Sequence, residues 1–200
     1  MGVCEQIKDD FRFYRSLRPK ESFLEVMLDR YFLVCANYRF GHWACQLRTP
    51  FVGKFLRFVY LLTRLVVCTL NGTDIRPGAV IGSRFEVHTS FGIMIDNGVV
   101  IGSNCLINTG VCLANKANGH GEGVPRIGNH VTFGMGCKVF GGITVGDHVI
   151  IGANAVVSRD VPSGHIALGN PAQNRPLKQK IPGTSFELKP DSLRISEPTF

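Results

Sequence analysis

The 200-residue sequence lacks the patterns by which several common protein classes are identified. It has neither a Cys-x-x-Cys nor a His-x-His pair, so it carries no signature of a metal site. Its most apolar segment, 51–70, is interrupted by Lys54, Arg57 and Arg64, and the uncharged run 58–62 is too short to span a bilayer. The net charge of +7 is spread out rather than gathered in a basic stripe with aromatic residues, which argues against nucleic-acid binding.

The sequence also gives no sign of a disulfide framework. Seven cysteines is an odd number, and residues 1–20 are charged rather than apolar, unlike a secretory leader. We therefore predict reduced thiols and a cytoplasmic protein, held at the inner face of the membrane if segment 51–70 docks on lipid.

What the sequence does contain is a repeat between Ile75 and Val161. Branched aliphatic or aromatic residues return at every sixth position in three runs, whereas a helix would repeat at three and four and a strand at two. A period of six is typical of the hexapeptide parallel β-helix, and it disfavours a β-sandwich. We predict a mainly β protein, a left-handed parallel β-helix of about four coils. The repeat positions are Ile75, Ile81, Val87, Ile95, Ile101, Ile107, Leu113, Ile127, Phe133, Val139, Val145, Ile151 and Val157.

In such a coil, three units of six residues close a triangle, and stacked coils bury one another's interior. The repeat residue points inward, and the residue four places later fills a corner where only small or β-branched side chains fit. Cys105 and Cys137 occupy such corners, so we expect them to act as small hydrophobic residues.

The repeat is interrupted twice. The spacing from Val87 to Ile95 is eight, and the spacing from Leu113 to Ile127 is fourteen, so that a loop over 114–126 protrudes. We expect a solenoid to break its register where it binds something, and these two breaks are therefore the candidate sites.

The flanking segments differ from the repeat. Residues 1–72 show helical spacing, with a short helix before Pro19, packing helices over 21–47 and an amphipathic helix over 51–70. That last helix packs on the β-helix or a neighbouring subunit, or lies on anionic lipid. The β-helix domain covers 73–177, and the polar segment 178–200 is expected to be a flexible tail.

Several motifs resemble the serine acetyltransferases and, more closely, the colanic-acid type of acetyltransferase in polysaccharide synthesis. They are the segments 74–82, 125–128, 141–147 and 152–162. The resemblance runs from about residue 36 to residue 175. It implies an acetyl-CoA-dependent O-acetyltransferase that assembles as a homotrimer with its active sites between subunits, and it implies no metal.

The resemblance also implies a general-base histidine and a carboxylate that orients it. Asp74 matches the carboxylate, but the position of the base falls on Thr89, and His88 takes the preceding place. A one-residue slip in the inserted bend would present His88, which we therefore predict as the base with Asp74 as its orienter. His120 in the protruding loop is the rival base.

The acceptor is less closely specified. The positions that hold the second histidine and the arginine of serine acetyltransferases are Val124 and Gly123 here, and neither binds a carboxylate. We therefore predict a hydroxyl of a sugar or polysaccharide precursor, with lipid-linked sugars included, and expect Thr89, Asn115 and Lys116 to contact it. The alternatives are L-serine as acceptor, in cysteine biosynthesis, and a non-catalytic scaffold. A γ-carbonic-anhydrase-like metalloenzyme would need three histidine ligands that the sequence does not supply.

For the donor, the resemblance implies backbone hydrogen bonds along one ledge and contacts to the nucleotide after the last coil. The usual cation there is replaced by Gln173, so Arg175 or Lys178 is the candidate phosphate ligand. The predicted cofactor-binding residues are Gly134, Met135, Gly152, Ala153, Gly169, Pro171, Arg175 and Lys178.

Overall fold

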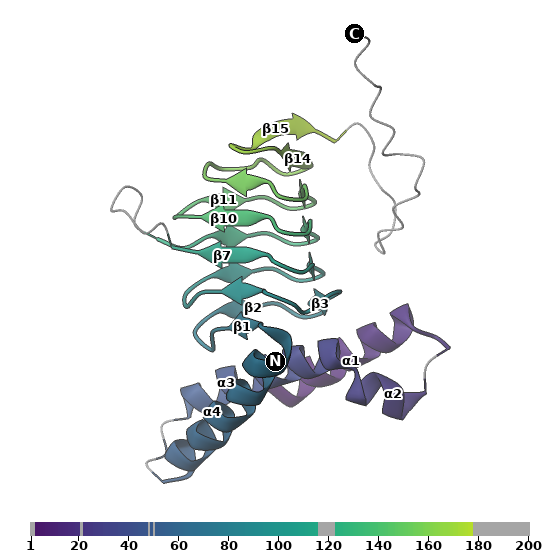
Figure 1. Cartoon of the computed structure of the whole chain (residues 1–200), viewed down its shortest axis with the longest axis vertical. Helices are drawn as coiled ribbons and strands as arrows, with labels where there is room; N and C mark the ends of the chain where they lie inside the picture. Colours follow the sequence, from purple (N-terminus) through teal and green to yellow (C-terminus); the bar gives the residue numbers. More distant parts are fainter. Residues whose placement is uncertain (1–2, 21, 48, 50, 116–122, 178–200) are drawn as a thin grey trace.

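The computed structural model describes residues 3–20, 22–47, 49, 51–115 and 123–177. A three-sided prism of short parallel strands stands on a base of helices, with the first strands next to the helices and the last strands at the far end (Figure 1). The predicted left-handed parallel β-helix is confirmed.

The strands form three sheets, one along each side of the prism, and all strand pairs are parallel except β14 with β15. Sheet A has the order β1-β4-β7-β10-β13, sheet B has β11-β8-β5-β2, and sheet C has β15-β14-β12-β9-β6-β3. The strands are β1 (Asp74–Ile75), β2 (Val80–Ile81), β3 (Glu86–Val87), β4 (Met94–Ile95), β5 (Val100–Ile101), β6 (Leu106–Ile107), β7 (Cys112–Ala114), β8 (Arg126–Ile127), β9 (Thr132–Phe133), β10 (Lys138–Phe140), β11 (Thr144–Val145), β12 (Ile150–Ile151), β13 (Val156–Val157), β14 (His165–Leu168) and β15 (Gln173–Pro176).

Each of the strands from β1 to β13 contains one of the predicted repeat residues, and all of these residues are buried. The corner residues Cys105 and Cys137 are also buried, and burial raises the pKa of the Cys137 thiol to about 12, so they act as hydrophobic residues as predicted. Phe91 lies four places after Val87 and would be a corner residue, yet it is 70% exposed. The inserted bend places the buried Ile93 in that corner instead.

The base consists of α1 (Val3–Leu17), α2 (Phe23–Leu28), α3 (Arg30–Gln46) and α4 (Val52–Asn71). The predicted helical stretch 21–47 is divided at Asp29, whose carboxylate accepts a hydrogen bond from Tyr31 N at 2.8 Å and so begins α3. Helix α4 ends at Gly72, which has the left-handed φ of 58° that turns the chain into β1.

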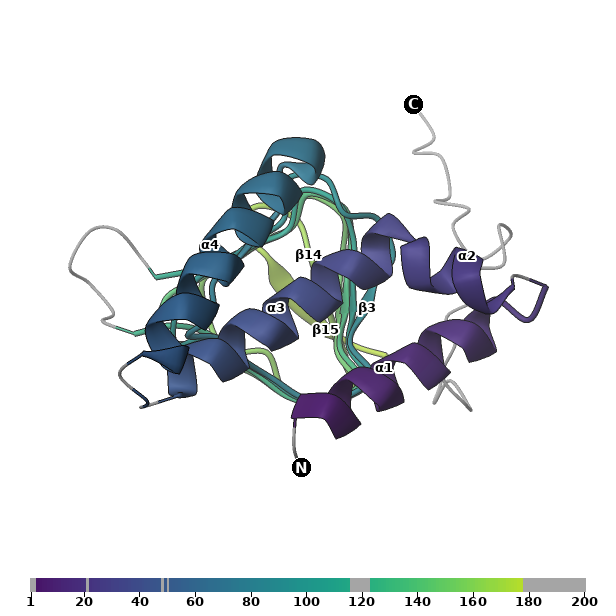
Figure 2. The same ribbon diagram turned by 90° about the horizontal axis from the view of Figure 1, so that it is seen from below.

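Side chains of α1 and α3 close the first coil. Figure 2 shows α3 crossing the open end of the prism with α1 beside it. The first coil has no coil beneath it, so its backbone groups would lack partners at a buried edge. Tyr38 Oη donates to Ala79 O at 2.8 Å and accepts from Ile81 N at 3.1 Å.

A buried ion pair completes this closure. Asp10 and Arg39 are each 1% exposed and lie 2.9 Å apart. Arg39 donates to the carbonyls of Ile81 and Gly82, while Asp10 accepts from the backbone N–H of Arg84 at 2.7 Å. The base therefore replaces the hydrogen bonds of a missing coil with side chains.

The structure assigns the cations of α4 a role that the sequence analysis did not foresee. Arg64 forms a bidentate pair with Asp74 at 2.8 Å, and Arg57 donates to the carbonyls of Cys45 and Leu47 at the end of α3. Two of the three cations that suggested contact with anionic lipid are thus engaged within the chain, and Lys54 has no such contact to another described residue. Among the described residues, no helix is both long enough and apolar enough to cross a bilayer.

Candidate active site

The predicted site residues lie along one edge of the prism, the corner where the chain passes from sheet C to sheet A. This C–A corner follows β3, β6, β9, β12 and β14, which stack in register. Because equivalent residues of successive coils stack, His88 comes into line with the predicted acetyl-CoA ligands Gly134, Met135, Gly152 and Ala153. We call these four residues the donor ledge. His88, Asn108, Gly134 and Gly152 each follow a strand of sheet C along this line.

His88 is the exposed histidine at the lower end of this corner. Its side chain is 60% exposed, and its Nδ1 lies 3.2 Å from Glu86 Oε1. A carboxylate only accepts hydrogen bonds, so the pair assigns the ring proton to Nδ1 and leaves the lone pair of Nε2 free. This is the tautomer that a general base requires.

The predicted pairing of Asp74 with His88 is not found within the described chain. Asp74 is bound instead by Arg64 and by Arg76, whose Nε lies 3.1 Å from Asp74 Oδ2. The carboxylate beside His88 belongs to Glu86 of β3, because His88, directly after the strand, continues its alternation of side chains. That alternation is the sequence signal that indicates Glu86 as a neighbour of His88.

The inserted bend that carries His88 is fixed to the turn after α4. Thr73 is buried and its hydroxyl donates to Ser90 O, while Ser90 Oγ donates to Asn71 Oδ1 at 3.3 Å. The N–H of Gly92 donates to Asn71 O at 3.3 Å. Three contacts therefore hold a bend that the sequence marked only as an extra pair of residues.

Thr89, the predicted acceptor ligand beside His88, is committed to the coil above. Its Oγ1 accepts from Thr109 N at 2.8 Å, and Thr109 Oγ1 donates to Phe91 O at 2.5 Å. The hydroxyl oxygen of Thr89 thus stabilises the bend. Its hydroxyl proton is available for a further hydrogen bond.

The donor ledge higher on the corner has two kinds of residue. Gly134 N donates to Ile151 O at 2.7 Å and Gly152 N donates to Ala167 O at 2.9 Å, so these predicted ligands use their N–H groups within the fold. A Cβ on Gly134 would lie 2.5 Å from Ala153 N, so the stacking of coils alone requires this glycine.

Met135 and Ala153 are the available donors on this ledge. Both are exposed, and their N–H groups have no acceptor among the described residues. Asn154 N donates to Met135 O at 2.8 Å, which keeps the two neighbouring turns in register. Two unpaired backbone donors on successive coils suit an extended ligand with carbonyl groups, or an oxyanion.

At the far end of the prism, β15 turns back antiparallel on β14, and Gly169 and Pro171 lie in the exposed turn between them. Val156 N donates to Gly169 O at 3.0 Å, which ties this turn to the upper end of the C–A corner. Arg175 is exposed and forms no ion pair with another described residue, so its charge is available to a phosphate. Lys178 lies outside the described residues.

The protruding loop leaves from a different edge. Asn115, which is exposed, and Gly123 are its described ends, between β7 of sheet A and β8 of sheet B. Lys116 and His120 lie outside the described residues. His88 follows β3 of sheet C, whereas the described ends of the loop follow β7 of sheet A and precede β8 of sheet B.

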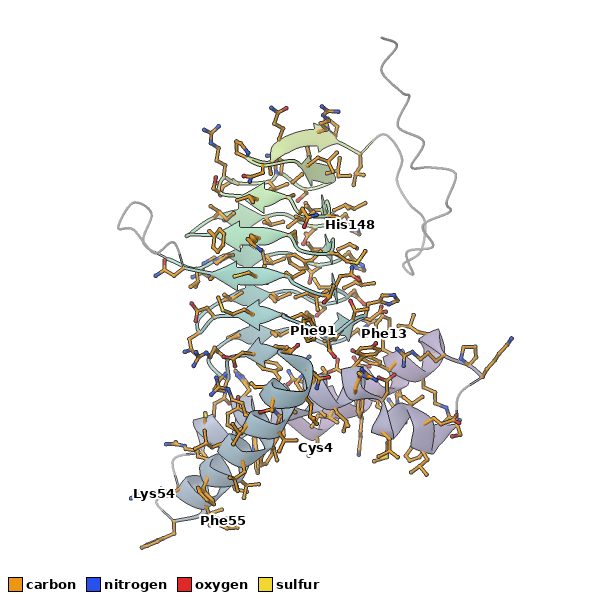
Figure 3. All side chains as sticks on the ribbon, viewed as in Figure 1. Cys4, Phe13, Lys54, Phe55, Phe91 and His148 are labelled. Carbon is orange, nitrogen blue, oxygen red and sulfur yellow. The ribbon has the colours of Figure 1, made fainter. Side chains whose placement is uncertain are left out.

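The corner between sheets B and C carries two further histidines. The rings of His130 and His148 stack in parallel, with centroids 4.6 Å apart and an interplanar angle of 8°. Figure 3 shows His148 higher along the prism than Phe91. Burial and the neighbouring His148 lower the pKa of His130, and the buried Nδ1 of His130 has no partner among the described residues.

This pair of histidines does not form a metal site. The lone pairs of parallel rings do not converge on one ion, and the described residues contain no cluster of three or more potential metal ligands. Away from this corner, His42 Nδ1 lies 2.8 Å from Pro77 O and His165 Nδ1 lies 2.9 Å from Ser163 O, so both rings have structural partners.

Comparison with known proteins gives a consistent set of relatives. The family model "Bacterial transferase hexapeptide (six repeats)" matches residues 125–159. The chain is 38% identical over 141 residues to a serine acetyltransferase of Synechococcus elongatus, a match that covers 70% of this chain and 54% of that protein. Identity to the Mycobacterium tuberculosis enzyme is 35%, covering 80% and 67%, and to a Helicobacter pylori enzyme 38%, covering 70% and 77%. The chain thus spans about half the length of the Synechococcus relative.

Solved structures agree with these relatives. Soybean serine acetyltransferase without ligand superposes with a TM-score of 0.74 at 27% identity, covering 87% of this chain and 69% of that chain. Serine acetyltransferase from Brucella abortus in complex with coenzyme A gives a TM-score of 0.73 at 25% identity, covering 86% and 66%. The soybean enzyme has also been solved with serine bound, with a TM-score of 0.74 to this chain at 27% identity, covering 87% and 70%.

Proposed function

The chain belongs to the serine acetyltransferase family of hexapeptide-repeat transferases, and from this premise we propose that it transfers an acetyl group from acetyl-CoA to the hydroxyl of L-serine. The relatives favour this acceptor over the sugar hydroxyl that the sequence analysis preferred, and they give no support to a role in polysaccharide biosynthesis. The transfer itself, from a thioester to a hydroxyl, is common to both interpretations.

The observation that carries the proposal is the composition of the C–A corner. The His88–Glu86 pair and the unpaired N–H groups of Met135 and Ala153 lie along the same edge. An acetyl transferase needs a base for the hydroxyl and donors for the oxyanion, and both are available here.

The donor fits the upper part of this corner. The N–H groups of Met135 and Ala153 would bind the amide carbonyls of the pantetheine arm, and the exposed side chain of Met135 would cover its apolar stretch. Arg175 at the far end would bind a phosphate of the nucleotide. When bound, acetyl-CoA supplies the acetyl group and a thiolate leaving group.

The chain's own residues would then perform the proton transfers. Glu86 holds the ring of His88 through Nδ1, so Nε2 accepts the proton of the acceptor hydroxyl as its oxygen attacks the thioester carbonyl. The same nitrogen returns the proton to the departing sulfur, which restores the neutral ring. A base of this kind contributes about 10²–10⁴ in rate.

We also propose that the working site lies between two chains of a homotrimer. His88 follows a strand at the C–A corner and the described ends of the loop lie at the A–B corner, so a contact between these two corners of neighbouring chains would bring them to one acceptor. Asn115, Lys116 and the rival base His120 would then approach the acceptor from the neighbouring subunit.

A sugar hydroxyl is the second candidate acceptor. Gly123 and Val124, which close the loop, offer no cation for the carboxylate of serine. A neutral acceptor would need none.

The test is a measurement of thiol release from acetyl-CoA with L-serine or with a panel of hexoses and amino sugars. Turnover on L-serine at a kcat/KM at least 100-fold above any sugar supports the proposal. Faster turnover on a sugar would support the sugar hydroxyl as acceptor instead of L-serine. The absence of thiol release with every hydroxyl acceptor would contradict both candidates.

A further inference from the structure

The bend that carries His88 is held by two buried polar side chains. Apart from tyrosine and cysteine, the structure buries only four polar or charged side chains in the part of the chain that it describes. Asp10 and Arg39 form the ion pair that closes the first coil. The other two are Thr73, which is 1% exposed, and Ser90, which is 4% exposed, and they contact each other.

The contacts of this second pair join the end of helix α4 to the bend. The Thr73 hydroxyl donates to Ser90 O, and Ser90 Oγ donates to Asn71 Oδ1 at 3.3 Å. Asn71 is the last residue of α4, and its carbonyl accepts from Gly92 N at 3.3 Å. Figure 3 shows Phe91, which belongs to the same bend, where the prism meets the helices. The lower side of the bend is therefore attached to the end of a long helix.

The upper side of the bend is attached to the next coil. His88 N donates to Ile107 O at 3.0 Å, and Thr89 Oγ1 accepts from Thr109 N at 2.8 Å. Backbone bonds between successive coils recur along the whole prism, whereas the buried hydroxyls do not. No buried polar side chain occurs in the corresponding turns of the described coils, which are 108–110, 134–136 and 152–154.

The buried hydroxyls select one conformation of the bend more than they stabilise the fold. Burial of a hydroxyl is unfavourable unless it is hydrogen-bonded, and a bonded pair adds little net stability. Any other arrangement of the bend would leave the buried hydroxyls without partners, so a satisfied pair specifies a single structure. A turn lengthened by two residues has more conformations to lose than a standard turn has. Thr73 and Ser90 thus restrict the segment that carries His88.

His88 depends on this restriction because its ring is weakly held by its own contacts. The side chain is 60% exposed, and Nδ1 lies 3.2 Å from Glu86 Oε1. A tight charged hydrogen bond is shorter, at about 2.7–2.9 Å. A ring held loosely at one nitrogen directs Nε2 at an acceptor only if the backbone that carries it is fixed. A misplacement of about 1 Å in a reacting group can lower a rate about 100-fold.

We propose that Thr73, acting through Ser90, is a positioning residue for His88. This inference rests on the proposed function, in which His88 is the base. Thr73 contacts neither the acceptor nor the donor in that function. Its hydroxyl fixes the bend, and the bend fixes the direction in which Nε2 of His88 points.

The test measures thiol release and combines Thr73→Val with His88→Ala. Valine keeps the shape of threonine but lacks the hydroxyl, so kcat should fall about 10-fold while the KM for acetyl-CoA stays the same. Thr73→Ser restores the hydroxyl and should recover most of the wild-type kcat. In the His88→Ala background, Thr73→Val should change the residual rate less than about twofold, because no base is left to position. An equal loss in both backgrounds would overturn the proposal.

Tyr38→Phe is the matched control. It removes another buried hydroxyl between the helices and the first coil, which donates to Ala79 O at 2.8 Å and accepts from Ile81 N at 3.1 Å. This variant should melt at a lower temperature with an unchanged kcat, because Tyr38 does not contact the bend. A loss of kcat as large as that of Thr73→Val would mean general destabilisation and would overturn the proposal. Ser90→Ala, which removes the contact with Asn71, replaces Thr73→Val if the valine variant does not fold.

A second readout does not depend on acetyl transfer. NMR of protein labelled with nitrogen-15 histidine should place the ring proton of His88 on Nδ1, as the contact with Glu86 requires. Thr73→Val should move part of this population to the Nε2–H tautomer, and His88→Ala identifies the signal. An unchanged tautomer would overturn the proposal. If His88→Ala keeps the wild-type kcat, the proposed base is wrong, and the tautomer still decides whether Thr73 orients the ring.

Discussion

The C–A corner and the B–C corner are built from the same six-residue unit, yet they place histidines in different surroundings. His88 directly follows its strand, carries a carboxylate partner and is 60% exposed on the side chain. His130 and His148 come two positions later in their turns, adopt the left-handed φ values of 56° and 55°, and stack on one another. The position within the turn therefore decides whether a histidine is free to act or is used in stacking.

The functional difference between the two corners is tested most directly by replacing each histidine. His88→Ala should lower kcat for acetyl transfer by about 10²–10⁴-fold, because the base is lost. His148→Ala removes a ring of similar size from the other corner and should leave kcat unchanged. Steady-state thiol release measures both, and an equal loss in the two variants would show that the corners do not differ in function.

The coils approach closely at both corners, since a Cβ on Gly128 of the B–C corner would lie 2.9 Å from Asp147 N, so what differs is the position along the stack. Gly134→Ala places a Cβ 2.5 Å from the backbone of the next coil, so it should lower the free energy of unfolding by about 1–3 kcal/mol. Gly164→Asn is the control near the far end of the B–C corner, where a Cβ would meet no atom of the described residues within 4 Å and asparagine tolerates the φ of 68°. Urea titration compares the two, and a larger loss for Gly164→Asn would contradict the packing described here.

A smaller effect should distinguish the role of Glu86. Glu86→Gln keeps the shape of the side chain but loses the charged hydrogen bond to the ring, so kcat should fall about tenfold. The KM for acetyl-CoA should not change, because the residue lies away from the donor ledge. An unchanged kcat would mean that the carboxylate does not position His88.

The smallest effect concerns acid stability at the B–C corner. The folded pKa of His130 lies below its ordinary value near 6.5, because of burial and the neighbouring ring. The unfolded chain therefore takes up the proton first, and stability is lost as pH falls below about 6.5. His130→Asn, which suits the left-handed turn, should flatten this part of the stability curve, as thermal melts between pH 7.5 and 5 would reveal.

The repeat was predictable because each coil obeys a local rule. An inward residue at every sixth position specifies the strand, the corner and the stacking, and every repeat residue from Ile75 to Val157 lies where that rule expects it. The closure of the first coil was not predictable, because Asp10 and Arg39 are 29 residues apart and appear in the sequence as ordinary surface charges.

The candidate site stays a prediction, and the structure shows partners for its residues that the sequence did not indicate. The interrupted spacing after Val87 predicted the bend that carries His88, and the family resemblance predicted the donor ledge. The assignment of Asp74 as orienter did not hold within the chain, because Arg64 of α4 binds that carboxylate. Such contacts arise from the packing of helices α1 to α4 on the prism, and no spacing within the repeat encodes them.

The most direct test of this account is a crystal structure of the assembled protein with coenzyme A bound. We expect the sulfur at the C–A corner, within about 4 Å of the imidazole of His88, with the pantetheine arm along Met135 and Ala153. A sulfur remote from every His88 in the assembly would contradict the assignment of the base and of the corner on which it stands.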